Sequence, residues 1–90
     1  MNLARINAGM SEIDNWAVEG DSIVRDFEFQ SFKEAIDFVN KVSEIAEKHQ
    51  HCPFILINFN IVHLQLTTHE EKGLSDKDFD VAKEIDLIGK

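Results

Sequence analysis

Hydrophobic and polar residues first alternate in the pattern of a short β-hairpin. Ile23 and Phe27 lie on one face of the segment that contains them, and most of the positions between them are charged. Glu19-Gly20-Asp21 supplies the turn, because glycine and aspartate adopt the conformations that tight turns require. We therefore predict strands at residues 16–18 and 22–29, in an antiparallel sheet covered on one side.

The next segment has the three-to-four-residue spacing of an amphipathic helix. It begins with Ser31-Phe32-Lys33-Glu34, a capping box in which the serine hydroxyl and the glutamate carboxylate each satisfy a free backbone N–H. The pattern continues to about His49, and Pro53 prevents a longer helix. The side chains expected on the buried side are Phe32, Ala35, Ile36, Val39, Val42 and Ala46. We predict a helix over residues 31–49.

Two further strands are predicted at residues 54–60 and 61–69, with a tight turn at residues 58–60. In the second strand one face is apolar and the other polar. The apolar face comprises Val62, Leu64 and Leu66, and the polar face His63, Gln65 and Thr67. The first strand is apolar at four consecutive positions, 54–57, so we expect one of its faces to pack against another subunit.

A second capping box, Ser75-Asp76-Lys77-Asp78, begins a helix at residues 75–88, and its two carboxylates complement the helix dipole. Its expected buried residues are Phe79, Ala82, Ile85 and Ile88. Residues 1–14 are weakly patterned and are predicted to form an N-terminal arm or one or two helical turns. The order strand-strand-helix-strand-strand-helix predicts an α+β fold, a four-stranded antiparallel sheet with the two main helices packed on one face.

Composition narrows the class of protein. Ninety residues indicate a single domain, 1–90, whose small core would gain stability from self-association. The net charge of -8, with nine basic residues among seventeen carboxylates, argues against nucleic-acid binding. There is no run of about 18 apolar residues that would span a membrane. The N-terminus lacks the apolar stretch of a secretory signal, and the one cysteine cannot form an internal disulfide, so we expect a cytoplasmic protein.

The candidate chemistry lies in two loops, residues 47–53 and 67–70. They contain three of the four histidines and the only cysteine and proline. Histidines gathered at the ends of elements indicate a bound group or proton transfer. A zinc site is one alternative, although His-x-His-Cys is not a familiar structural spacing; its ligands would be His49, His51, Cys52 and His69. Nucleophilic catalysis by Cys52 is another alternative. We interpret His49 and His63 as surface residues.

Six residues have the spacing of a known family motif: Glu47, His51, Pro53, Phe59, His69 and Asp78. The motif consists of a charged residue, a histidine, a small residue or proline, an aromatic residue, a histidine or tryptophan, and an aspartate at matching separations. The flanking residues 66–70 and 72–78 are also similar to the family. On these residues the chain resembles the pterin-4a-carbinolamine dehydratases, over about residues 16–88.

The resemblance implies a hydro-lyase that dehydrates 4a-hydroxy-tetrahydropterin to quinonoid dihydropterin and so recycles a pterin cofactor. It also implies a homodimer or homotetramer, and no metal or redox cofactor. The departing hydroxyl needs a proton and N5 must lose one, so we assign His51 as the general acid and His69 as the base or second proton carrier. Asp78, or a water held by it, would set the tautomer of His69. Glu47 would bind the guanidine-like edge of the pterin. The substrate-binding set comprises Glu47, Gln50, Thr67, Thr68, Glu70 and Asp78.

The chain departs from the family at Cys52, where a second catalytic histidine is usual. Gln50 stands where an acid is common, and Ile55 where some members have tryptophan. A thiol is a poorer proton shuttle than an imidazole near neutral pH, so we expect Cys52 to reduce activity without abolishing it. The alternative is a catalytically weak or inactive family member that acts as a protein-binding module, either an assembly factor or a dimerisation cofactor.

Overall fold

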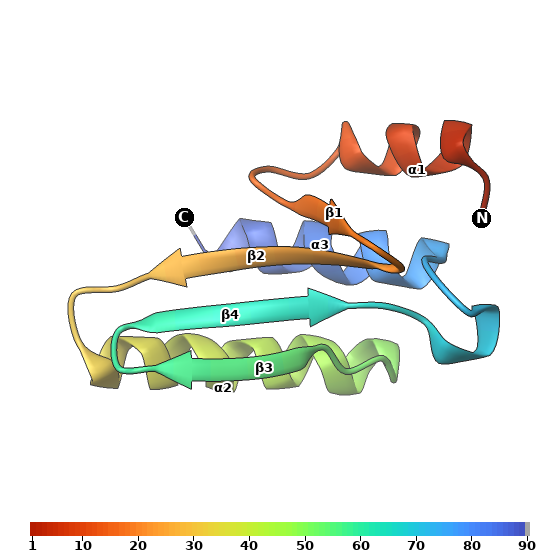
Figure 1. Cartoon of the computed structure of the whole chain (residues 1–90). Helices are drawn as coiled ribbons and strands as arrows, with labels where there is room; N and C mark the ends of the chain where they lie inside the picture. Colours follow the sequence, from red (N-terminus) through yellow and green to blue (C-terminus); the bar gives the residue numbers. More distant parts are fainter. Residues whose placement is uncertain (90) are drawn as a thin grey trace.

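The computed structural model describes residues 1–89 as one antiparallel sheet and three α-helices. In chain order the elements are α1 (Leu3–Met10), β1 (Ala17–Glu19), β2 (Ser22–Glu28), α2 (Phe32–His49), β3 (Phe54–Asn58), β4 (Ile61–Leu66), the 3₁₀ helix η1 (His69–Glu71) and α3 (Asp76–Ile88). The sheet has the strand order β1-β2-β4-β3, and α2 and α3 lie side by side on one of its faces (Figure 1). The predicted α+β fold and element order are confirmed, with α1 in the N-terminal arm.

Strand β4 lies in the interior of the sheet and supplies much of the core. Val62, Leu64 and Leu66 are fully buried toward the helices, as their alternation predicts. The antiparallel register pairs Leu64 with Ile55 of β3 on one side and with Arg25 of β2 on the other. Within residues 1–89 no helix covers the opposite face of the sheet (Figure 1), so the polar positions of β4 lie on the open face.

Helix α2 buries a slightly different side from the one predicted. The buried positions are Ala35, Phe38, Val42 and Ala46, and the ring centroids of Phe38 and Phe27 lie 4.7 Å apart. The prediction for Phe32 was wrong, because this side chain lies in the first turn, away from the centre of the buried side, and is 50% exposed. Neither α2 nor any other helix within residues 1–89 is long and apolar enough to cross a lipid bilayer.

A buried carboxylate in α3 connects the last helix to the first hairpin. Asp86 is 7% exposed, and its Oδ1 accepts hydrogen bonds from Trp16 Nε1 at 2.8 Å and from Arg25 at 2.6 Å. Its Oδ2 accepts the backbone N–H of Asp14 at 2.9 Å. The guanidinium of Arg25 also lies 4.1 Å above the ring centroid of Phe27. Because both carboxylate oxygens accept hydrogen bonds and Arg25 pairs the charge, the carboxylate can remain buried.

The segment after β4 departs from the predicted strand. The ladder ends at Leu66, three residues earlier than predicted, and Thr68 instead pairs with Gly73 across a short loop. The Thr68 N–H donates to Gly73 O at 2.9 Å, and the Gly73 N–H donates to Thr68 O at 3.2 Å. His69 therefore begins a 3₁₀ turn and does not end a strand.

Candidate functional site

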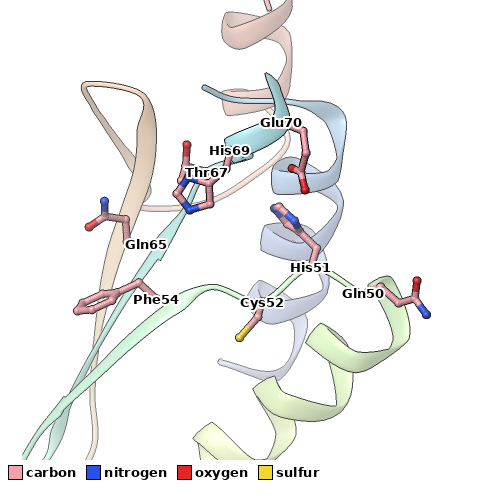
Figure 2. Close-up of a pocket in the computed structure, with 8 residues that line it drawn as sticks. All are labelled: Gln50, His51, Cys52, Phe54, Gln65, Thr67, His69 and Glu70. Atoms are coloured by element: carbon pink, nitrogen blue, oxygen red, sulfur yellow. The ribbon is translucent and has the colours of Figure 1, made fainter. Parts of the chain in front are cut away.

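A cavity of about 530 Å³ lies where α2 ends and β4 leaves the sheet. Its lining residues are Gln50, His51, Cys52, Phe54, Gln65, Thr67, His69 and Glu70 (Figure 2). The volume falls within the roughly 300–1,000 Å³ of small-molecule sites. The fold thus brings together the two loops in which the sequence concentrates its histidines.

His51 is positioned by the way α2 ends. Gln50 adopts a left-handed conformation with φ of 51°, and the His51 N–H donates to Ala46 O at 3.0 Å, so the chain turns away from the helix axis. The His51 side chain is only 11% exposed, and its Nε2 lies 2.5 Å from Asp78 Oδ1. Since an ionised carboxylate can only accept, Nε2 carries the proton, and Nδ1 is left as the nitrogen that can exchange a proton.

Asp78 is fully buried and holds His51, although we predicted that it would hold His69. Its second oxygen, Oδ2, accepts the hydroxyl of Thr68 at 2.8 Å and the backbone N–H of Ser75 at 2.9 Å. The latter bond belongs to the predicted capping box of α3, which forms. The carboxylate of Asp78 therefore faces inward from the first turn of α3, whereas His69 lies in the exposed 3₁₀ turn.

His69 approaches the same cavity from the other loop. Figure 2 shows the imidazole rings of His51 and His69 turned toward one opening, with the carboxylate of Glu70 beside His51. Thr67 also lines the cavity, but its hydroxyl donates to Asp21 O at 2.6 Å. The arrangement offers two imidazoles to a ligand, one nearly buried and one exposed to solvent, which suits proton transfer in both directions.

Cys52 has an exposed thiol that leaves its loop on the opposite side from His51 (Figure 2). Its sulfur donates only a weak hydrogen bond, to Pro53 O at 3.3 Å. A second, smaller cavity of about 330 Å³ lies on that side, lined by Ser43, Ala46, Glu47, Gln50, His51, Cys52 and Ile55. Glu47 therefore lines this neighbouring cavity and not the larger one. The two cavities share Gln50, His51 and Cys52 as a common wall.

Phe54, Gln65 and Thr68 lie in positions relative to the larger cavity that we did not predict from the sequence. Phe54 and Gln65 line the larger cavity, and the register pairs them directly across β3 and β4. Gln65 could have been found from its position on the polar face of β4, two residues before Thr67. Thr68, which we predicted to contact the substrate, is 2% exposed and lies outside the cavity lining.

The other two histidines lie away from the cavity and have carboxylate partners of their own. His63 Nδ1 lies 2.6 Å from Asp26 Oδ1, and His49 contacts Glu84, so both are only partly exposed. Lys48 Nζ also lies 2.7 Å from Glu84. The hydrogen bond from Lys48, followed by that from His49, holds the pKa of Glu84 below its ordinary value. Within residues 1–89 the structure gathers no group of three or more His, Cys, Asp or Glu that could hold a metal ion.

A family model and individual relatives indicate the same protein family for this chain. The family model described as pterin 4 alpha carbinolamine dehydratase matches residues 1–88. A relative from Thermomicrobium roseum, provisionally named a pterin-4-alpha-carbinolamine dehydratase, is 44% identical over 82 residues, which cover 91% of this chain and 88% of the relative. A relative from Picosynechococcus with the same provisional name is 47% identical over 83 residues, covering 92% and 90%.

Solved structures agree with this result. The crystal structure of a transcriptional coactivator/pterin dehydratase from Brucella melitensis has a TM-score of 0.94 at 29% identity, covering 100% of this chain and 98% of that one. A pterin dehydratase-like protein identified as a RuBisCO assembly factor in the alpha-carboxysome has a TM-score of 0.72 at 16% identity, covering 87% and 93%. The second likeness concerns the fold alone.

Proposed function

Because the chain belongs to the pterin-4-alpha-carbinolamine dehydratase family, we propose that it dehydrates a 4a-hydroxy-tetrahydropterin to the quinonoid dihydropterin. The observation that carries this proposal is the pair of imidazoles, His51 and His69, turned toward one opening of a cavity of about 530 Å³ (Figure 2). A bicyclic ring with a proton to lose and a hydroxyl to release needs two such groups.

The reaction divides between the two histidines in a definite way. His51, as an imidazolium whose Nε2–H is held by Asp78, delivers its Nδ1 proton to the 4a-hydroxyl and is left as the neutral Nε2–H tautomer. The C4a–O bond then breaks, water leaves, and the N5 proton passes to His69 as the C4a–N5 double bond forms. His69 is exposed and returns its proton to solvent, while His51 regains one, so the reaction involves no net oxidation.

The remaining lining residues suit a flat, polar heterocycle. We assign Gln65 and Glu70 to the hydrogen-bonding edge of the ring, because an amide and a carboxylate both accept from guanidine-like N–H groups. Phe54, which is 58% exposed beside Gln65, offers an aromatic face. Glu47 lines the neighbouring cavity, so we assign it to the part of the substrate that extends past Cys52.

Stopped-flow dehydration of a 4a-hydroxy-tetrahydropterin tests the proposal. We expect the wild type to exceed the solvent rate, and Cys52→His to raise kcat by up to about 10²–10⁴-fold, the usual contribution of one acid–base group. Cys52→Ala is the matched control, because it removes the thiol without adding an imidazole, and should resemble the wild type. No wild-type rate above solvent would reject the enzyme and favour a protein-binding module.

We also propose that the chain self-associates through β3 and acts in the cytoplasm. The location is proposed from the single cysteine, whose thiol is free. Strand β3 forms an edge of the sheet and exposes Phe54 by 58% and Leu56 by 52%. Edge strands carry unpaired backbone groups that a second copy can pair. Leu56→Lys should lower the mass measured by light scattering to that of a monomer, whereas Val18→Lys on the other edge strand should not. An unchanged mass for Leu56→Lys would reject this interface.

A further inference from the structure

Thr68 is a buried residue of the loop at residues 67–70, which supplies His69. It is only 2% exposed, and it does not line the cavity, although its sequence neighbours Thr67 and His69 do. A side chain in this place cannot touch a ligand in the cavity. Its hydrogen bonds therefore indicate a different role from substrate binding.

The backbone of Thr68 closes the loop that carries His69. Its N–H donates to Gly73 O at 2.9 Å, and its carbonyl accepts from the N–H groups of Gly73 at 3.2 Å and of Glu71 at 3.1 Å. His69 is the next residue along the chain and the first of the 3₁₀ turn. The backbone of Thr68 thus fixes where His69 enters the cavity.

The side chain of Thr68 reaches the other imidazole through Asp78. Thr68 Oγ1 lies 2.8 Å from Asp78 Oδ2 and 2.7 Å from Ser75 Oγ. A carboxylate has no proton to donate, so the Thr68 hydroxyl donates to Asp78, and the Ser75 hydroxyl must then donate to Thr68. With the Ser75 N–H also on Oδ2, the plane of the carboxylate is fixed and Oδ1 is left for His51 Nε2–H.

We propose that Thr68 is a positioning residue that aligns both imidazoles at once. Its backbone holds the loop of His69, and its hydroxyl holds His51 through Asp78. The expected effect on kcat rests on the proposed dehydration. The structural effect, a single tautomer of His51, can be measured without turnover. Without the hydroxyl the carboxylate can rotate, and His51 loses its fixed tautomer and orientation.

Thr68→Val tests the proposal, because it keeps the backbone bonds and approximate shape but removes the hydroxyl. Nitrogen-15 NMR of the histidine rings should find His51 with Nε2 protonated in the wild type, both tautomers in Thr68→Val, and the wild-type state restored in Thr68→Ser. His49 and His63, which pair with other carboxylates, are controls in the same spectra. We expect kcat to fall by about 10–100-fold with KM nearly unchanged, because a hydrogen bond to a charged group is lost.

The outcomes separate this proposal from the proposed function. An unchanged His51 tautomer in folded Thr68→Val would overturn the positioning role, as would a loss confined to KM. Altered signals from all four histidines would also overturn it, by revealing a general loss of structure. If Thr68→Val fails to fold, Thr68→Ala removes the same hydroxyl in a smaller side chain and should mix the His51 tautomers in the same way. If the wild type has no turnover, dehydration is rejected, and the tautomer measurement alone decides the role of Thr68.

Discussion

Replacing Asp78 by asparagine should separate proton transfer from folding. The amide can keep its oxygen toward the two donors on Oδ2, Thr68 and the Ser75 N–H, so the NH₂ group then faces His51 Nε2. Two donors now face each other unless the ring moves its proton to Nδ1. A hydrogen bond to a charged group contributes about 1.5–3 kcal/mol. If the transition state loses this free energy of stabilisation, kcat falls by about 10- to 150-fold.

The assay is single-turnover stopped-flow dehydration of a 4a-hydroxy-tetrahydropterin, together with urea unfolding. Asp78→Asn keeps two of its three hydrogen bonds, so we expect the free energy of unfolding to fall by only about 1 kcal/mol. Asp80→Asn makes the same change of charge at an exposed position of α3 and should leave both measurements unchanged. A wild-type kcat in Asp78→Asn, or a loss that appears only in KM, would refute the role of the His51–Asp78 pair.

Three further changes test the packing and the electrostatics of the fold. Gly9→Ala places a Cβ 2.7 Å from the ring of Phe79, so urea unfolding should show a loss of about 1–3 kcal/mol; wild-type stability would contradict this close contact. Asp86→Ala removes the carboxylate that the half-buried Arg25 and the buried Trp16 indole share, so thermal unfolding should show a loss of about 3–5 kcal/mol, and a smaller loss would count against the network. The hydrogen bond from Lys48 is the main cause of the lowered pKa of Glu84. The ionised Glu84 carboxylate therefore stabilises the folded protein at neutral pH, and this stabilisation is lost as the pH falls through that pKa. Glu84→Gln should therefore be about 0.5 kcal/mol less stable at about pH 7 and match the wild type at about pH 3; an equal deficit at both would contradict the linkage.

Much of the fold could be predicted from the sequence, because its local signals agree with one another. Ser31 and Ser75 begin the two main helices where the capping boxes predict, and the alternation of β4 buries the predicted face. The loops at residues 47–53 and 67–70 meet at one cavity, as the concentration of histidines there suggested. The capping boxes and the alternation depend on neighbours within a few positions of the chain, and the hairpin of β3 and β4 joins the two loops.

The connections within the site could not be predicted, because they depend on how distant segments pack. Spacing alone did not reveal that Asp78 lies against the end of α2, 27 residues earlier, where it holds His51 and not His69. The early end of β4 follows from the pairing of Thr68 with Gly73, which competes with the ladder. A single reassigned carboxylate thus changes which imidazole has a fixed tautomer.

The hydrogen bond between Trp16 and Asp86 also gives the protein an intrinsic optical probe. Trp16 is the single tryptophan of the chain, it is 7% exposed, and its indole nitrogen contacts α3 directly. The wavelength of its emission should therefore follow the docking of α3, the same helix that supplies Asp78 to His51. Titrating a ligand while recording fluorescence would reveal movement of that helix without any label.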